Sequence, residues 1–284
     1  MTDSLGSDAT VADDGRHEPP PVKEPLAPND GKRLDIEING SRWARIPIQT
    51  ELFGRGDDLV GKVVTYVEKP VRLARESGDS RLADSFARAW YVVVSEKIVA
   101  ISQGRSYFTW EINPGLPAKI LAKFVARTPH GIGLGSPWTM QLAINEAGLP
   151  RILLAAGASV LGKLVGRKGV FYQVAGHRVN AIDGPTSYSA YPSNVSAKLP
   201  PKDPDKVAAE LTSALRQRLT ENGPREAAVT LAGTVVIDSN DLGRDVLGQD
   251  SDRPAEFFCA LFADNPFGQG RQQTPIAVCV ELHP

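Results

Sequence analysis

The sequence has few cysteines and no long apolar run, and both absences limit the kind of protein it encodes. Its 284 residues include only two cysteines, Cys259 and Cys279, each inside an apolar stretch. Two such residues suggest buried thiols in a reducing compartment, although spacing alone does not exclude one disulfide bond between them. No apolar run approaches the roughly 18 residues of a membrane span, and residues 1–30 lack the apolar core of a secretory signal. We therefore expect a soluble, cytoplasmic protein with no membrane partner.

An excess of charge of either sign is also missing. The net charge is -1, so no basic field indicates a nucleic-acid partner. Large apolar residues are nearly absent from residues 1–33, which instead carry Asp, Ser, Gly and a Pro19-Pro20-Pro21 run. Such a segment cannot bury enough surface to offset its chain entropy. The sequence therefore predicts a disordered, proline-rich tail over residues 1–33, with order beginning near Leu34.

Beyond Leu34, strand-like and helix-like patterns follow one another without the regular alternation of a doubly wound sheet. Asn39-Gly40 is a hairpin turn between two strand-like segments, and Asp203 followed by Pro204 is typical of a helix start. The pattern predicts an α+β fold with mixed or antiparallel sheets flanked by helices. Strands are predicted at 34–38, 43–48, 90–105 with a break near 95, 169–175 and 230–237; helices are predicted from 59, at 117–127, at 137–147, from 204 and at 254–263. Residues 151–165 fit either a strand or a buried helix.

Aspartates follow two apolar segments of the chain. Asp238-Ser239-Asn240 comes directly after a predicted buried strand, and Asp183 follows Val179–Ile182. An acidic residue just past a strand is well placed to hold a metal ion, because the strand fixes its direction and the loop leaves oxygen ligands open. The alternative is an Asx turn that simply closes the strand, since these are ordinary turn residues. The second aspartate shifts the balance toward a metal-binding pair.

Two further features have a functional and a structural interpretation. Lys97 lies at the break in the strand run and is suited to clamping a phosphate, or equally to lying at a solvated strand edge. Glycines at 131–135 precede Ser136-Pro137 and would let the backbone approach an anion. Their spacing fits neither the dinucleotide fingerprint nor the phosphate loop, so a flexible loop is the default interpretation.

Several short motifs in one order resemble the coenzyme F-420 gamma-glutamyl ligase family. Val179 to Asp205 is similar to the family's Val-Asn-Ala-Gly-Ile-Asp segment and its Leu-Pro-Pro-x-Asp-Pro-Asp run, the most specific piece of the match. Several weak motifs in collinear order are stronger evidence than any one of them. The resemblance covers roughly residues 44–282 and extends to Gly56–Leu59, Ser95–Arg105, Val235–Arg244, Gly268–Gly270 and Thr274–Ile276.

The resemblance implies an enzyme that forms a gamma-glutamyl type of amide bond. Family members use GTP, with a divalent metal, to add glutamate to a deazaflavin precursor. For this chain it implies GTP or ATP as cosubstrate, Mg²⁺ or Mn²⁺ as cofactor, and an amino acid and a small-molecule carboxylate as the joined partners. The carboxylate would first be phosphorylated, and the amine would then attack the acyl phosphate. The resemblance also implies a single α+β unit over residues 34–284 that forms a homodimer.

Site residues carry over from the family only by position. Asp183 and Asp238 are implied as metal ligands, and Ser239 stands where the family has a threonine ligand. Lys97 is implied as a catalytic and nucleotide-binding residue that neutralises phosphate charge. The remaining implied nucleotide contacts are Gln49, Thr50, Glu51, Leu52, Asn240, Gln269 and Gly270.

The chain also departs from the family pattern. Ser102-Gln103-Gly104-Arg105 replaces Ala-Glu-Gly-Arg, Ile101 stands where a lysine is expected, and Gln269 replaces a glutamate. Thr186 stands roughly where an asparagine follows the first metal-binding aspartate. The stretch after Arg244 is shorter than in the family, and residues 131–166 are expanded. These changes favour an alternative, a non-catalytic relative that binds a nucleotide or another small molecule as a sensor or partner subunit. A structural protein that recruits partners through the proline-rich tail is a third possibility.

Overall fold

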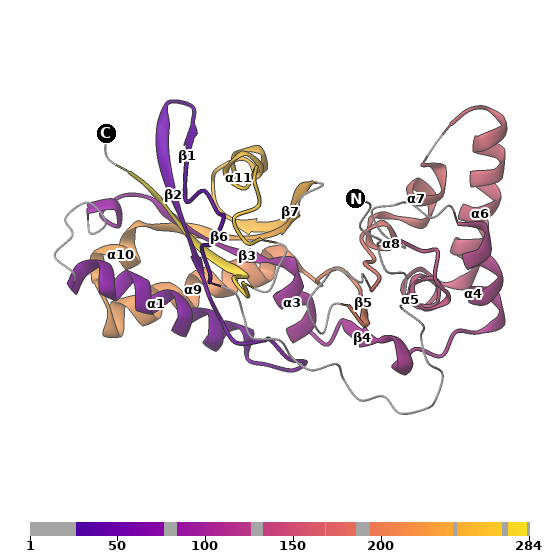
Figure 1. Ribbon diagram of the computed structural model, residues 1–284, viewed down its shortest axis with the longest axis horizontal. Coiled ribbons are helices and arrows are strands. Elements are labelled where there is room, and N and C mark those ends of the chain that lie inside the picture. Colours follow the sequence, from indigo (N-terminus) through magenta and orange to yellow (C-terminus); the bar gives the residue numbers. More distant parts are fainter. Residues whose placement is uncertain are drawn as a thin grey trace, which may run out of the picture.

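The computed structural model describes residues 27–76, 84–125, 133–167, 169–185, 194–240, 243–268 and 272–282. Residues 1–26 of the predicted tail lie outside these stretches. Residues 27–33 include a turn, and Lys32 Nζ donates to Thr274 Oγ1 at 2.7 Å. The chain forms a mixed sheet covered by helices and a second, helical part, joined through a small two-stranded sheet (Figure 1). The predicted α+β class with a mixed sheet is confirmed.

The main sheet has six strands in the order β1-β2-β8-β3-β6-β7. Only β3 and β6 pair in parallel, and all other neighbours are antiparallel. It follows that β2, β3 and β6 run in the same direction and end at the same edge. The strands are β1 (Asp35–Ile38), β2 (Ser41–Ile48), β3 (Trp90–Ser95), β6 (Leu231–Ser239), β7 (Arg244–Asp250) and β8 (Ile276–Glu281).

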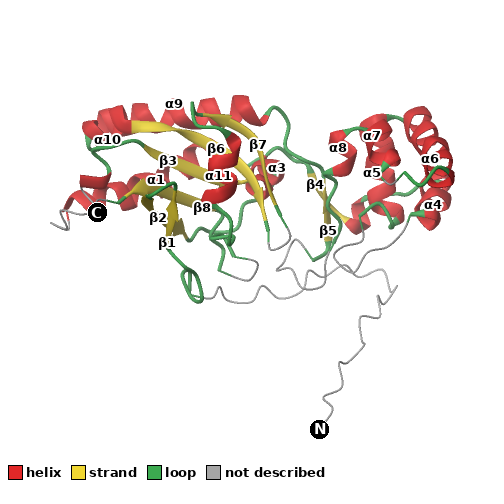
Figure 2. Cartoon of the chain, turned by 90° about the horizontal axis from the view of Figure 1, so that it is seen from above, coloured by secondary structure: helices red, strands yellow, loops and turns green. Residues whose placement is uncertain are grey.

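Helices cover both faces of this sheet (Figure 2). Side chains alternate between the faces of a strand, so Val92, Val94 and Val236 pack under α1 and α9. Val93, Val235 and Ile237 pack on the opposite face under α11. Burial on both faces explains why β3 is apolar from Trp90 to Val94, all of which are buried. The covering helices are α1 (Leu59–Glu76), α9 (Pro204–Asn222), α10 (Arg225–Thr230) and α11 (Ala255–Leu261).

The long helices begin close to where the sequence predicts. The Asp58 carboxylate accepts a hydrogen bond from Gly61 N at 3.0 Å at the start of α1. Helix α9 begins at Pro204, but the Asp203 side chain makes no capping bond and its backbone is left-handed, with φ 48°. Asp205 Oδ1 instead accepts from Gln249 N at 2.9 Å, which ties the first turn of α9 to β7.

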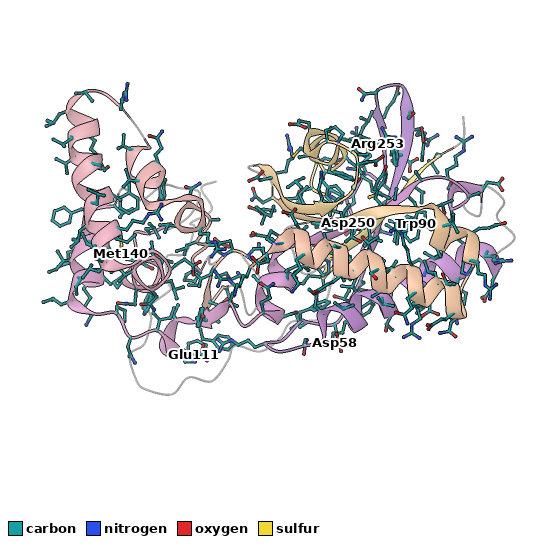
Figure 3. The ribbon with its side chains drawn as sticks, turned by 180° about the vertical axis from the view of Figure 1, so that it is seen from behind. Asp58, Trp90, Glu111, Met140, Asp250 and Arg253 are labelled. Carbon is teal, nitrogen blue, oxygen red and sulfur yellow. The ribbon has the colours of Figure 1, made fainter. Side chains whose placement is uncertain are left out.

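The helical part has its own apolar core, which includes Met140, Ile152 and Val179. Figure 3 shows Met140 in this part and Trp90 in the sheet part. The elements are β4 (Ser106–Phe108), η1 (Thr109–Glu111), α4 (Leu116–Leu121), η2 (Ala122–Phe124), α5 (Pro137–Ala147), α6 (Leu149–Leu164), α7 (Val170–Ala175), α8 (His177–Asn180) and β5 (Ser196–Lys198). No single described helix has the length and apolar character to cross a membrane; α5 and α6, bent by 113° at their junction, meet that criterion only as a pair.

Two secondary-structure predictions are wrong. The segment 169–175 is helix α7 rather than a strand; it lies between Gly169 and Gly176, both with positive φ, and its side chains pack in the helical core. The strand predicted to continue past residue 95 is instead α3 (Glu96–Ser102), because the Ser95 side chain accepts from Lys97 N and starts a helix. Residues 151–165, left open between strand and helix, fall almost entirely within α6.

Arg45 connects β2 to the segment after α11. Its side chain is fully buried, Nη1 donates to Leu261 O at 3.0 Å and Nη2 donates to Asp264 Oδ2 at 3.1 Å. It also contacts Arg33 O, so the guanidinium fixes three separate segments. Burial acts to raise the pKa of Asp264, but the hydrogen bonds and charge of Arg45 outweigh it and lower that pKa.

We expect Arg45→Met to lower the free energy of unfolding by about 2–4 kcal/mol, because it leaves two carbonyls and a carboxylate without their buried partner. Urea denaturation followed by circular dichroism measures the change. Arg42→Met is the control, since the Arg42 and Asp35 side chains form an exposed pair, and it should cost less than about 1 kcal/mol. Equal losses in the two variants would contradict an anchoring role for Arg45.

Candidate functional site

The shared edge at which β2, β3 and β6 end brings together segments that are far apart in the sequence. Ile48 and Val94 both pair with Ile276, the first residue of β8. At the end of β3, Ser95 N donates to Pro275 O at 2.8 Å, and just beyond β2, Thr50 N donates to Gln273 O at 2.9 Å. The predicted nucleotide contacts after β2, Lys97 after β3 and Asp238 near the end of β6 therefore lie along one edge of the sheet.

Five charged side chains gather next to this edge. Glu96 and Lys97 begin α3, and Asp238 lies at the end of β6. Asp183 and Lys198 come from the connection to the helical part, where their backbones exchange hydrogen bonds of 3.0 and 2.8 Å. Lys198 Nζ lies 3.9 Å from Asp183 Oδ2. We call this group of five residues the charged cluster.

Burial makes the charged cluster electrostatically unusual. Burial and the negative charges of Asp238 and Asp183 raise the pKa of Glu96 to about 8, against the opposing effect of Lys97 and Lys198. Burial also raises the pKa of Asp238, although Lys97 opposes the shift. The side chain of Lys198 is only 5% exposed; burial lowers its pKa, and Asp183 partly offsets that change. A positively charged ligand beside these carboxylates would therefore favour their ionised form.

Asp238 and Asn240 belong to the hairpin between β6 and β7. Asn240 Oδ1 accepts from Gly243 N at 3.0 Å, and Asn240 Nδ2 donates to Asp238 Oδ1 at 3.4 Å. A side-chain to backbone bond therefore closes this turn, although it spans three residues and not the two of the Asx turn considered for this motif. The same turn leaves Asp238 within electrostatic reach of Lys97 and Asp183. The structural and functional interpretations of this motif are thus compatible.

The structure does not bring the Ser239 hydroxyl together with Asp238. Neighbouring residues of a strand face opposite sides of the sheet; Val236 belongs to one apolar core, Val235 and Ile237 to the other. Ser239 accordingly points to the α11 side, where its Oγ lies 3.3 Å from Asn265 Oδ1. As a metal ligand, Ser239 would need a different backbone conformation from the one in this strand.

The segment after β2 divides into two environments. Gln49 Nε2 donates to Gln272 O at 3.1 Å, so Gln49 and Thr50 both contact the segment before β8. Glu51 instead pairs with Lys62 of α1 at 2.8 Å, and Leu52 is 38% exposed. Gln269 and Gly270 lie outside the described residues.

The Leu-Pro-Pro run is held against the segment after α3, and this contact positions Lys198. Leu199 N donates to Arg105 O at 2.9 Å, and Arg105 Nε donates to Pro200 O at 2.5 Å. Gln103 Nε2 donates to Lys202 O at 2.8 Å, and its Oε1 accepts from Lys202 N at 2.7 Å. An ionised glutamate at position 103 could not donate the first of these bonds. Gln103, a departure from the family pattern, is therefore suited to the two hydrogen bonds that it makes with the backbone of Lys202.

Glu96 and Lys198 are site residues that the sequence interpretation missed. Glu96 directly precedes Lys97, so its position after a buried strand was a usable signal. Lys198 lies in a short strand of small residues and is buried. Its burial depends on the contact between the Leu-Pro-Pro run and the segment after α3, which no local pattern reveals.

A divalent cation fits the donor atoms of the charged cluster, although the site is not preassembled. Among the described residues, no three Asp, Glu, His or Cys side chains are close enough to hold one ion together. Carboxylate oxygens are nevertheless the ligands that Mg²⁺ and Mn²⁺ prefer. Burial, together with nearby carboxylates, raises the pKa of Glu96 and Asp238, and a bound cation would act against both shifts.

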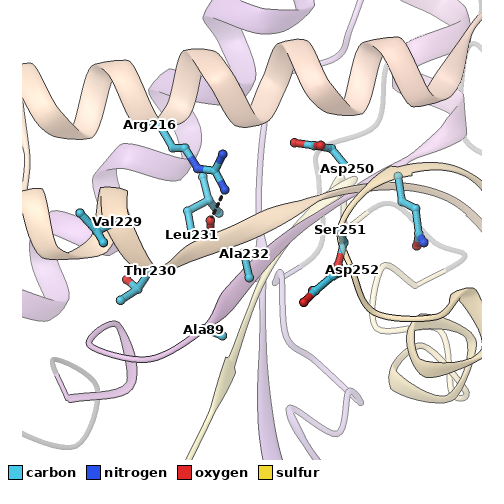
Figure 4. A pocket seen from close by; sticks show the side chains of 10 residues that line it. Ala89, Arg216, Val229, Thr230, Leu231, Ala232, Asp250, Ser251 and Asp252 are labelled. Carbon is cyan, nitrogen blue, oxygen red and sulfur yellow. Dashed lines mark hydrogen bonds between the residues drawn. The ribbon is translucent and has the colours of Figure 1, made fainter.

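A separate pocket lies elsewhere in the described part of the chain. It has a volume of about 610 Å³ and surrounds the start of β6 and the end of β7 (Figure 4). Arg216 extends into this region and donates to Leu231 O at 2.7 Å, with Asp250 and Asp252 nearby (Figure 4). Because Leu231 and Asp238 are at opposite ends of β6, this pocket is separate from the charged cluster.

Comparisons with known proteins do not assign the chain to a family. No family model matches the sequence, and no curated protein matches it. The chemical interpretation of the charged cluster therefore depends on its residues and their geometry, together with the motifs identified in the sequence.

Glu96→Gln should make stability less dependent on pH. A carboxyl group whose pKa rises from 4.5 to about 8 on folding binds a proton in the folded but not the unfolded protein between those values. Wild-type stability therefore falls as pH rises through that window, by up to about 1.4 kcal/mol per pH unit. We expect Glu96→Gln to be about 2–4 kcal/mol more stable than wild type at the top of this window and similar to it at the bottom.

Urea denaturation across this pH range measures the effect. Glu210→Gln is the control, because Glu210 is an exposed residue of α9 that pairs with Lys206. Parallel pH profiles for wild type and Glu96→Gln would show that Glu96 does not have a raised pKa.

Proposed function

We propose that this protein is a nucleotide- and metal-dependent amide ligase, related to coenzyme F-420 gamma-glutamyl ligases, that joins an amino acid to a small-molecule carboxylate. The charged cluster is the observation that carries the proposal. It combines two lysines with three carboxylates at the edge where the sequence predicts phosphate and metal contacts. Such a combination suits phosphoryl transfer, in which positive charge must meet the phosphate and carboxylates must hold its cation.

The reaction would have two steps. A carboxylate oxygen of the acceptor attacks the terminal phosphorus of GTP or ATP, forming an acyl phosphate and releasing the nucleoside diphosphate. The amine of the amino acid then attacks the acyl carbon, and the C–O bond to phosphate breaks. The products are an amide, inorganic phosphate and a proton. Both steps require that negative charge on phosphate be neutralised, and the second step also requires that the amine lose its protons.

Each cluster residue has a role in this scheme. Asp183 and Asp238 would hold Mg²⁺ or Mn²⁺, which supplies charge neutralisation at the phosphates when bound. Lys97, which lies within electrostatic reach of Glu96 and Asp238, would contact the transferred phosphate, with Lys198 as a second cation. The pKa of Glu96 is about 8; a bound cation would lower it, and the ionised carboxylate would then accept a proton from the attacking ammonium group.

A non-catalytic nucleotide-binding protein is the second candidate, and specific observations favour it. The Ser239 hydroxyl faces away from Asp238, and Glu51 is paired with Lys62. The family resemblance assigns Ser239 to the metal and Glu51 to the nucleotide, but in the structure both side chains contact other residues of the protein. A protein with these losses could still hold a nucleotide through Lys97 and the two aspartates while lacking the alignment that transfer requires.

Nucleotide binding should require metal and both aspartates. We expect GTP or ATP to bind wild type in the presence of Mg²⁺ or Mn²⁺, and Asp183→Asn with Asp238→Asn to weaken binding at least about tenfold, because metal affinity depends on carboxylate charge. Isothermal titration calorimetry measures both. Asp35→Asn, a substitution in an exposed ion pair on β1, is the control. If wild type binds neither nucleotide with either metal, the ligase proposal fails.

Turnover separates the two candidates. A ligase should release phosphate from the nucleotide only when an accepted amino acid and carboxylate are both present, and Lys97→Met should lower kcat roughly 100-fold through loss of phosphate neutralisation. A coupled phosphate assay with a panel of amino acids and carboxylates measures this. Lys69→Met changes an exposed lysine of α1 and should leave kcat unchanged. Binding without turnover across the panel would select the non-catalytic candidate.

A further inference from the structure

The outer side of the helical part carries an exposed apolar surface. On α6 and just beyond it, six large apolar side chains are between 50% and 79% exposed: Leu153, Leu154, Val160, Leu161, Leu164 and Val165. At about 3.6 residues per turn they fall on one side of the helix. The buried residues Ile152, Ala155 and Gly162 fall on the other side, against the helical core. The apolar stripe of α6 therefore faces away from the helical core.

A second stripe lies on α4 and η2. Leu116, Ile120 and Phe124 recur every four residues and are 47–77% exposed. Figures 1 and 2 both draw α4 and α6 at the end of the helical part that is farthest from the six-stranded sheet. We call the nine residues of these two stripes the outer face. Elsewhere in the described parts of the chain, the exposed large apolar residues are Leu52, Leu73 and Val229.

Charge is distributed unevenly between the helical part and the rest of the chain. Residues 112–182 contain eight Lys and Arg residues and one acidic residue, Glu146, so this stretch has a net charge of +7 within a chain of net charge -1. Glu146 is itself engaged by Arg105 at 3.1 Å. Lys119 and Lys123 beside the second stripe, and Lys163 and Arg167 beside the first, are exposed. Basic side chains therefore border the outer face.

We propose that the outer face binds the surface of an anionic phospholipid bilayer. The apolar side chains would enter the boundary between headgroups and acyl chains, while the bordering lysines and arginines contact lipid phosphates. This binding places α6 parallel to the membrane. Its 16 residues span only about 24 Å, less than a bilayer core of about 30 Å, so α6 is too short to cross. The lack of an apolar run that could span a bilayer predicts no membrane partner; the proposal departs from that prediction, since binding at the surface needs no such run.

Charge distinguishes the bilayer from a second copy of the chain. Pairing two outer faces would bring together two stretches of net charge +7, whereas an anionic leaflet complements that charge. The surface thus combines exposed apolar side chains with a basic border, as membrane-surface helices do. The proposal is independent of the ligase chemistry, because none of the outer-face residues belongs to the charged cluster.

Vesicle co-sedimentation of the full chain tests the proposal. Wild type should bind vesicles of phosphatidylcholine and phosphatidylglycerol in equal amounts at least about tenfold more tightly than vesicles of phosphatidylcholine alone. High salt should reduce this binding, because it screens the basic border. Wild type that binds both kinds of vesicle equally weakly would overturn the proposal.

Paired substitutions test the two components of the surface. Leu161→Ser with Leu164→Ser removes apolar contact, and Lys163→Glu with Arg167→Glu reverses charge; each pair should weaken binding at least about tenfold. Val229→Ser is the matched control, because Val229 is an 84% exposed apolar residue on α10, and it should bind as wild type does. All of the substituted residues are exposed, and circular dichroism checks that wild type and the three variants are folded.

Sedimentation velocity without lipid tests self-association through the same surface. One outcome would overturn the proposal and assign the outer face to contact between copies: wild type does not bind vesicles but forms an oligomer, and Leu161→Ser with Leu164→Ser dissociates that oligomer. Unchanged vesicle binding by either substituted pair would overturn it as well. Loss of binding in both pairs, with binding kept by Val229→Ser, would support it.

Discussion

The common direction of β2, β3 and β6 is the constraint on which the rest of the molecule depends. Three strand ends meet at one edge because β8 lies antiparallel between β2 and β3, and β6 pairs in parallel with β3. Both faces of these strands are covered by helices. The edge where these strands stop is left open to polar side chains, and Glu96, Lys97 and Asp238 all lie there.

Gathering charges at a partly buried edge opposes folding, and the contacts around it offset that cost. The raised pKa of Glu96 and the lowered pKa of Lys198 show that neither charge is fully compensated by the other. Backbone pairing of Asp183 with Lys198, and the Gln103 and Arg105 contacts to the Leu-Pro-Pro run, hold these groups in place. A site with this balance is suited to a ligand that brings compensating charge.

Strong periodicity predicted much of the fold, and tertiary contacts decided the remainder. Helices α1, α5 and α9, the first hairpin and strand β3 followed from spacing, capping residues and turn chemistry. Helix α7 was missed because Val, Phe and Tyr favour strands locally, whereas packing on the helical core decides its structure. For the site, Asp183, Asp238 and Lys97 could be predicted from motifs. Lys198 could not, because its place in the site depends on long-range contacts. The direction of the Ser239 side chain could not be predicted either, because it depends on which residues of β6 face each side of the sheet.

The charged cluster draws its members from both parts of the molecule. Glu96, Lys97 and Asp238 are attached to the large sheet, while Asp183 and Lys198 are attached to the connection that leads into the helical part. Any hinge motion between the two parts must therefore change the distances between these charges and, with them, the number of protons bound. If the two parts move relative to one another, proton uptake is linked to that movement, and conditions that fix the ionisation of the cluster would restrict it.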